Sequence, residues 1–351
     1  MSNIEQLWQG NPSAAPGVAT LTDEGHRATT GLAPGVAGEK AGLTAAGAAD
    51  RVAKEAGTRG SGSRGDSMAA RWWLAACLLW LGTLAGAQAG EAARAPEARD
   101  GFRFVQLSDL HCANAKRNPP PRFAFDMHRL DLVRSFALVE AAVREMNETV
   151  KPDFVVVTGD LVDDGRDRES LARVKTILDK LACPYHPVIG DHDSREAWRR
   201  VFGAERLNYT FRHGGWRSLA ADSSPGVLDE ATLAWLDREL RADPATPTAM
   251  FIHRPIAVPE LYVAAARAAY GVPLLLGNAA EVQARLAKAG NVRAVFAGHC
   301  HMGIECRSPG LAHYVAPSLA EPPHAYRVVE IRGTEIRTEL RALKHVPEGV
   351  R

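Results

Sequence analysis

The chain has 351 residues, of which 46% are hydrophobic and 24% are charged, as in soluble globular proteins. Its 42 basic and 41 acidic residues leave a formal net charge of +1, so bulk attraction to a nucleic-acid polymer is not expected. The length would allow two domains, but the composition reduces the part that can fold.

Residues 1–67 are predicted to be a disordered or misassigned N-terminal extension. There is no aromatic residue from Gln9 to Arg71, and small and charged residues dominate, so this segment cannot bury a core. Two interpretations stay open. Either translation begins at Met68 and the extension comes from a start assigned too far upstream, or a disordered cytoplasmic tail precedes a signal anchor and makes the protein a membrane-tethered scaffold.

Residues 68–89 are typical of a secretory signal peptide. Arg71 gives a positive start, an apolar run covers residues 72–84, and Ala87 and Ala89 form an A-x-A cleavage site. The run is shorter than the roughly 20 residues that a membrane span needs. The sequence therefore predicts a periplasmic or secreted protein without a stable membrane span in its mature form.

Cleavage after Ala89 would leave a linker, residues 90–100, and one domain, residues 101–345. About 260 residues would remain, enough for a single well-buried domain. Cys77 ends a sequence similar to a lipoprotein cleavage box, but too little apolar chain precedes it and too much follows, so lipidation is not expected.

Five short apolar runs in this domain each end at residues that bind metals in other proteins. Such runs are typical of buried strands, and open α/β sheets bind ligands at the carboxyl ends of their strands. The runs are residues 102–107, 154–157, 188–189, 249–252 and 292–297. The polar residues that follow them are Asp109, His111, Asp160, Asp191, His192, Asp193, His253, His299 and His301.

The chemistry of these residues predicts a dinuclear metal centre. Carboxylate and imidazole together suit Zn, Mn or Fe, so two divalent or mixed-valence ions are the expected cofactors. Seven of these nine residues acting as ligands would be too many for one tetrahedral ion but would suit two ions that share a carboxylate. A pair of ions about 3.5–4 Å apart can activate a bridging hydroxide and neutralise the oxygens of a phosphate ester.

The five blocks, in this order, resemble the calcineurin-like metallophosphoesterase superfamily, whose blocks read D-x-H, G-D, G-N-H-D/E, H and G-H-x-H. Here they read Asp109-Leu110-His111, Gly159-Asp160, Gly190-Asp191-His192-Asp193, His253 and Gly298-His299-Cys300-His301. The resemblance covers about residues 102–340. It implies an α/β (α+β) fold, a four-layer αββα sandwich of two mixed sheets with the dinuclear metal site at strand ends, and hydrolysis of phosphoric esters.

The resemblance also implies a role for each residue. One metal would take Asp109, His111 and His301, the other Asp191, His253 and His299, and Asp160 would bridge them. His192 would stabilise the transition state or protonate the leaving oxygen, and Asp193 would orient its ring.

Asp191 stands where the family has asparagine. An anionic ligand in place of an amide binds cations more tightly, weakens their Lewis acidity and removes an amide donor to the substrate phosphate. Three interpretations stay open: a working enzyme with a shifted metal preference, which we favour, a slower enzyme, or a site that only binds. Asp191→Asn is accordingly expected to keep the fold and alter the metal dependence.

Apolar spacing predicts three helices and a second sheet. Residues at intervals of three or four predict helices that cover a sheet face over residues 132–146, 171–181 and 233–240. Two short strands are expected within residues 208–222, around Gly214 and Gly215. Later runs are expected to close the fold as antiparallel strands, over residues 311–316, 326–331 and 336–340.

Two features near the expected ligands have alternative interpretations. The Pro-rich, basic link of residues 112–129 either reaches over the substrate phosphate or is a solvated insertion. Four cysteines follow the cleavage site, Cys112, Cys183, Cys300 and Cys306, and an exported protein could pair them. Cys112 and Cys300 neighbour expected ligands, but alternation favours packing behind the site over thiolate ligation.

Residues 215–236 are similar to the branch with class III cyclic-nucleotide phosphodiesterases and purple-acid-phosphatase-like enzymes. Where that branch commonly has a second histidine after the His253 position, this chain has Arg254, which either binds a phosphate oxygen or forms a salt bridge. We therefore predict an exported metal-dependent phosphoesterase that hydrolyses small phosphate mono- or diesters through a bridging hydroxide. The alternative is a non-catalytic phosphate- or metal-binding protein on the same fold. The sequence does not indicate the oligomeric state.

Overall fold

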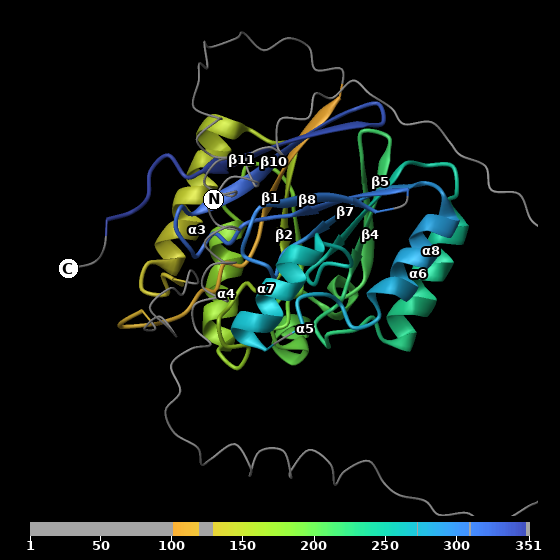
Figure 1. The fold of residues 1–351 in the computed structure, drawn as a ribbon. Helices are drawn as coiled ribbons and strands as arrows, with labels where there is room; N and C mark the ends of the chain where they lie inside the picture. Colours follow the sequence, from red (N-terminus) through yellow and green to blue (C-terminus); the bar gives the residue numbers. More distant parts are fainter. Residues whose placement is uncertain (1–100, 119–128, 272, 309, 349–351) are drawn as a thin grey trace, which may run out of the picture. The chain divides into compact units, whose positions relative to one another are not determined.

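The computed structural model describes residues 101–118, 129–271, 273–308 and 310–348 (Figure 1). These residues lie in the second of two compact units, Gly62–Arg351. The predictions for the extension, the signal peptide and the linker fall outside the described residues. So does the middle of the basic link, residues 119–128.

Two mixed sheets form the centre of the domain. The first has the order β11 (Glu335–Ala342), β10 (Ala325–Arg332), β1 (Phe102–Leu107), β2 (Phe154–Thr158) and β3 (Tyr185–Val188). The second has the order β4 (Tyr209–His213), β5 (Trp216–Ala221), β6 (Thr248–Ile252), β7 (Val292–Ala297), β9 (Leu311–Val315) and β8 (Ile304–Ser308). In the first sheet, β1, β2 and β3 are parallel, and β10 and β11 are antiparallel at one side. In the second sheet, antiparallel β4 and β8 flank the four parallel strands β5, β6, β7 and β9. Both sheets are therefore mixed, as the resemblance implies.

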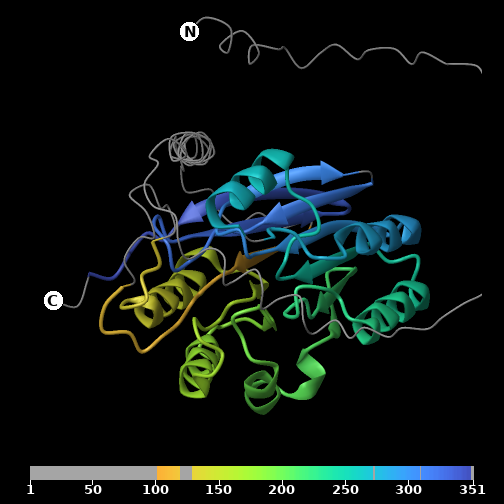
Figure 2. The ribbon, with the colours of Figure 1, turned by 60° about the horizontal axis from the view of Figure 1, so that its bottom comes forward.

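Helices cover the outer face of each sheet, which gives four layers (Figures 1 and 2). The first sheet packs against α3 (Ser135–Glu145), α4 (Arg168–Leu178) and α5 (Arg195–Val201). The second packs against α6 (Glu230–Ala242), α7 (Glu260–Tyr270) and α8 (Ala279–Ala289). Two short helical turns also occur, η3 (Met146–Val150) and η4 (Ala204–Arg206). The predicted four-layer fold is confirmed.

Alternation along β1 explains why the strands are apolar on both faces. Val105 and Leu107 point to the helix side, whereas Phe104 points to the other sheet. The Phe104 ring stacks on Phe154, with centroids 4.9 Å apart, and meets Phe296 edge-on at 5.2 Å. An aromatic layer thus joins the two sheets and fixes the relative position of their strand ends.

The three helices predicted from apolar spacing are present as α3, α4 and α6. The last two begin at side-chain caps, where Asp167 and Asp229 accept from Ser170 N and Thr232 N. The predicted pair of short strands is β4 and β5, which opens the second sheet. No helix in the described part of the chain is long and apolar enough to cross a membrane.

One prediction about the last strands is wrong. β10 and β11 form the expected antiparallel hairpin in the first sheet, but β9 lies in the second sheet, parallel to β7. The chain changes sheets between β9 and β10. The hydrophobic pattern of a strand predicts its buried faces but not its partner, so local sequence could not reveal this exchange.

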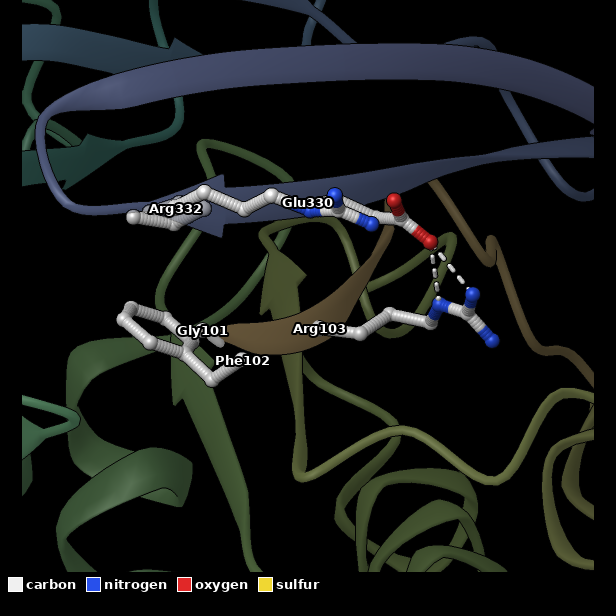
Figure 3. A pocket seen from close by; sticks show the side chains of 6 residues that line it. Gly101, Phe102, Arg103, Glu330 and Arg332 are labelled. Carbon is white, nitrogen blue, oxygen red and sulfur yellow. Dashed lines mark hydrogen bonds and ion pairs between the residues drawn. The ribbon is translucent and has the colours of Figure 1, made fainter. Parts of the chain in front are cut away.

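A shallow pocket of about 50 Å³ lies where β1 begins, lined by residues of β1 and β10 (Figure 3). Arg103 points toward Glu330 there and forms an ion pair with it. This is the opposite end of β1 from the predicted ligands, so the pocket takes no part in the site.

Candidate metal centre

The predicted ligands meet at the carboxyl ends of five strands, three from the first sheet and two from the second. Main-chain hydrogen bonds join the loops that carry them. Asp109 N donates to Gly159 O and His111 N to Asp160 O, both at 3.0 Å, and Gly298 N donates to His253 O at 2.9 Å. The loops after β1 and β2, and those after β6 and β7, are therefore held in fixed register.

The backbone at these positions is strained. Five of the predicted ligands have left-handed φ angles between 41° and 67°, namely Asp109, His111, Asp160, His299 and His301. Non-glycine residues adopt such conformations rarely, at a cost on the order of 1 kcal/mol or more each, and these conformations cluster at functional sites. The loops also approach so closely that a Cβ on Gly190 would lie 2.2 Å from Asp160 Oδ1, so only glycine fits there.

One group of possible ligand atoms gathers Asp109, His111, Asp160 and His301 within 4.8 Å of one another. His301 Nε2 lies 3.3 Å from Asp109 Oδ1 and 3.2 Å from His111 Nε2. Asp109 is fully buried, and both of its carboxylate oxygens also accept from His299 N at 3.1 Å. This group corresponds to the predicted first metal position.

A second group gathers Asp160, Asp191, His253 and His299. Asp191 Oδ1 lies 2.7 Å from His253 Nε2 and 3.3 Å from His299 Nδ1. This group corresponds to the predicted second metal position.

Asp160 belongs to both groups. Its Oδ2 lies 3.7 Å from His111 Nε2 in the first group and 3.2 Å from His253 Nε2 in the second. Its Oδ1 accepts from His192 N at 2.9 Å. The structure thus brings all seven predicted ligands together, with one oxygen of Asp160 at the position of a shared ligand.

Three of the four histidines in these two groups are oriented by acceptors that lie outside the groups. Nδ1 of His253 donates to Thr158 O at 2.8 Å, which leaves its Nε2 facing the carboxylates. His301 Nδ1 lies 2.7 Å from Glu321 Oε1, and His111 Nδ1 lies 3.2 Å from Asp163 Oδ1. No role was predicted for Asp163. Glu321 follows β9 in a segment without a metal-ligand motif, so motif spacing could not indicate Glu321.

The donor set fits two cations. His111 and His301 each turn Nδ1 toward a carboxylate, so their Nε2 atoms face each other at 3.2 Å, and a cation could take both as ligands. The ion-pair partners of buried Asp109 and Asp160 are histidines. Buried carboxylates of this kind need positive charge nearby.

The pKa shifts of His253 and Asp160 arise from the same close approach of carboxylates and histidines. Burial lowers the pKa of His253, but the charge of Asp160 and the hydrogen bonds with Asp160 and Asp191 outweigh it and hold that pKa well above its ordinary value. Burial raises the pKa of Asp160, but His253 and His111 outweigh it, so the carboxyl pKa is lowered. The carboxylates therefore remain ionised and attract positive charge.

We predict that Glu321→Gln weakens metal binding at the first position by about ten- to a hundredfold, because the amide removes the charge that holds His301 Nδ1–H. The measurement is a titration of metal-stripped protein with Mn²⁺. Glu335→Gln in β11 is the matched control, since Glu335 is exposed and pairs with Arg337. An unchanged affinity in Glu321→Gln would mean that His301 is held without Glu321.

His192 lies beside the two groups, with its ring edge-on to His111 and centroids 4.7 Å apart. Its side chain is exposed, and its Nδ1 donates to the main-chain oxygen of Asp163 at 2.8 Å. Nε2 is therefore the ring nitrogen available to a substrate. Burial lowers the pKa of His192, but Asp160 and the carbonyl of Asp163 outweigh it, so the pKa is raised.

The prediction that Asp193 orients the His192 ring is wrong. The carboxylate of Asp193 accepts from Leu161 N at 3.0 Å, Val162 N at 3.2 Å and Gly190 N at 2.9 Å. Burial, together with the charge of Asp160, raises the pKa of Asp193 to about 7. Asp193 therefore ties the loop after β2 to the loop after β3. A main-chain carbonyl, which no sequence motif reveals, orients His192 instead.

Cys112 and Cys300 pack behind the site, as expected. Each lies in a hydrophobic core on the helix side of its sheet, and burial raises the pKa of both thiols. Cys183 and Cys306 are half-buried, and all four cysteines of the described part are free thiols. Neither buried thiol belongs to the groups of possible metal ligands.

Known proteins resemble this chain over the region that contains the candidate metal centre. The model of the calcineurin-like phosphoesterase family matches residues 102–303. A 3',5'-cyclic-nucleotide phosphodiesterase of Nostoc sp. is 28% identical over 223 residues, which cover 61% of this chain and 77% of that protein. A probable glycerophosphodiester phosphodiesterase of Arcobacter nitrofigilis is 28% identical and covers 43% of this chain.

Coverage of some relatives is partial. A probable cyclic nucleotide phosphodiesterase of Synechococcus sp. is 31% identical over 43% of this chain. The matches span 58% of that protein and 56% of the Arcobacter relative. Among solved structures, a dimetal phosphatase from Danio rerio has the same fold, with a TM-score of 0.52, 19% identity, and coverage of 68% of this chain and 98% of its own.

Proposed function

Because this chain belongs to the calcineurin-like phosphoesterase family, a family of hydrolytic enzymes, we propose that it is a metal-dependent hydrolase of small phosphate mono- or diesters. The observation that carries the proposal is the pair of Asp and His groups that share Asp160, with the exposed His192 beside them. The relatives described above are named phosphodiesterases, which favours diesters as the first substrates to test.

The family and the donor set support two divalent ions. We propose Fe, Mn or Zn, because these ions suit mixed carboxylate and imidazole ligands. Asp109, His111 and His301 would hold one ion, and Asp191, His253 and His299 the other, with Asp160 shared. When bound, the pair would supply a bridging hydroxide as nucleophile and neutralise the phosphoryl oxygens.

Proton donation to the leaving group and positioning of the loops are the roles of the protein's own groups. The raised pKa of His192 favours its protonated form, whose Nε2–H can donate to the leaving oxygen as the ester bond breaks. The Asp163 carbonyl holds the ring through Nδ1, so the proton-donating nitrogen faces the site. Asp193 keeps the two loops that carry Asp160 and His192 in register. No covalent phosphoenzyme is needed.

The test is hydrolysis of bis(4-nitrophenyl) phosphate and 4-nitrophenyl phosphate by the purified full chain, with metal content measured on the same samples. We expect release of nitrophenol from at least one ester, abolished by a chelator and restored by Mn²⁺, Zn²⁺ or Fe²⁺. A protein that carries two ions per chain yet hydrolyses neither ester would instead support the alternative, a non-catalytic phosphate or metal binder.

We further propose export to the periplasm or beyond the cell. The basic start at Arg71, the apolar run of residues 72–84 and the cleavage motif at Ala87 and Ala89 support this proposal. Sequencing the N-terminus of the mature protein from a bacterial host tests it, and Gly90 is the expected first residue. An uncleaved chain in the cytoplasm would contradict export.

A further inference from the structure

Asp191 divides its two carboxylate oxygens between different partners. Oδ1 faces the second metal position, at 2.7 Å from His253 Nε2 and 3.3 Å from His299 Nδ1. Oδ2 points elsewhere and forms an ion pair with the guanidinium of Arg254. Asp191 can therefore offer one oxygen to an ion, as a neutral amide side chain would.

Arg254 is built into this arrangement. It follows His253 directly at the end of β6, and its main-chain N donates to Ser223 Oγ at 3.0 Å. Its side chain is 18% exposed, as is that of Asp191, and its Nη1 donates to Pro273 O at 3.3 Å. Its Nε is buried and has no hydrogen-bond partner among the described residues. The ion pair with Asp191 is therefore the main interaction that holds the charged guanidinium in place.

The positive charge of Arg254 offsets the additional negative charge of Asp191. Asp109, Asp160 and Asp191 bring three negative charges to the two positions, and Arg254 returns one positive charge at the edge of the second. The sum equals that of two carboxylates and a neutral ligand. An ion pair with little solvent exposure is poorly screened, so the charge of the guanidinium still acts on a cation bound at the second position.

We propose that Asp191 and Arg254 act as one unit, in which Arg254 restricts Asp191 to a single-oxygen ligand and cancels its additional negative charge. Arg254 is a positioning residue that sets the affinity of the second position for divalent cations. The proposal rests on the proposed function, since it assumes that this position binds an ion. It goes beyond that function by identifying the residue that tunes the site.

The test is a set of three variants, Asp191→Asn, Arg254→Gln and the double variant, each stripped of metal and titrated with Mn²⁺ by calorimetry. Asp191→Asn leaves Arg254 as an uncompensated positive charge, so we expect affinity to fall about ten- to a hundredfold. Arg254→Gln removes the opposing charge but keeps a donor to Oδ2, so affinity should rise about tenfold. The double variant should return to within about threefold of the parent.

Arg285→Gln is the matched control, because Arg285 is a half-buried arginine that pairs with two carboxylates, Asp237 and Glu281, away from the site. Its Mn²⁺ affinity should equal that of the parent. Turnover gives a second readout: Arg254→Gln should lower kcat, because more negative charge weakens the bound Lewis acid, with KM nearly unchanged. The double variant should recover the lost kcat.

Two results would overturn the proposal: an Mn²⁺ affinity in Arg254→Gln equal to that of the parent, or a double variant as weak as Asp191→Asn alone. A parent protein that binds no ions would instead contradict the proposed function. Thermal unfolding of the metal-free variants checks that each one folds.

Discussion

Asp160→Asn is expected to leave a folded protein that has lost nearly all phosphoesterase activity. Oδ2 of Asp160 lies within 3.7 Å of His111 Nε2 and 3.2 Å of His253 Nε2, so its charge serves both proposed metal positions. Removing a shared anionic ligand should cost about 4 kcal/mol of transition-state stabilisation, about a thousandfold in rate.

Asparagine is the appropriate replacement because it preserves the local structure. The φ of Asp160 is 51°, a conformation that asparagine tolerates better than most residues. Its side-chain oxygen can still accept from His192 N, as Asp160 Oδ1 does at 2.9 Å. Loss of activity in this variant would therefore report the missing charge and not a collapsed loop.

Metal content per chain and hydrolysis of bis(4-nitrophenyl) phosphate are the measurements. Asp164→Asn is the control, because Asp164 lies in the same loop but is exposed and pairs only locally, with Arg166. The control should keep both metal content and rate. If Asp160→Asn retained two ions and parental activity, the shared-ligand proposal for Asp160 would be wrong.

Sequence predicted the meeting of distant ligands because two local signals coincide at each strand end. A short apolar run indicates a buried strand, and the first polar residue after it stands at the sheet edge, as Asp160 does after β2 and His253 after β6. Neither signal requires knowledge of which strands are neighbours. All seven predicted ligands consequently lie together in the structure.

The features that sequence could not predict depend on contacts between distant segments. β9 and β10 are close in the chain yet lie in different sheets, because strand pairing is decided by packing and not by local pattern. Glu321 reaches His301 from the segment after β9. His192 is oriented by a main-chain carbonyl, a group that every residue carries. Asp193, which was predicted to orient it, accepts hydrogen bonds from main-chain N–H groups instead.

His192→Ala should slow hydrolysis while both ions stay bound, because His192 supplies no atom to the two groups that share Asp160. If Nε2–H protonates the leaving oxygen, the loss of rate should increase with the basicity of that oxygen. For an alkyl phosphate ester, whose alcohol is a poor leaving group, we expect a fall of about 10³- to 10⁴-fold. For a nitrophenyl ester, whose phenolate departs unaided, the fall should be only about tenfold.

The comparison between the two esters separates proton donation from electrostatic stabilisation. A histidine that only stabilises phosphoryl charge would slow both esters alike, and that outcome would remove the acid role from His192. His345→Ala is the control, because His345 is exposed near the C-terminus, beyond β11. Metal content measured on the same samples should equal that of the parent, since a loss of ions in His192→Ala would place the histidine among the ligands and not beside them.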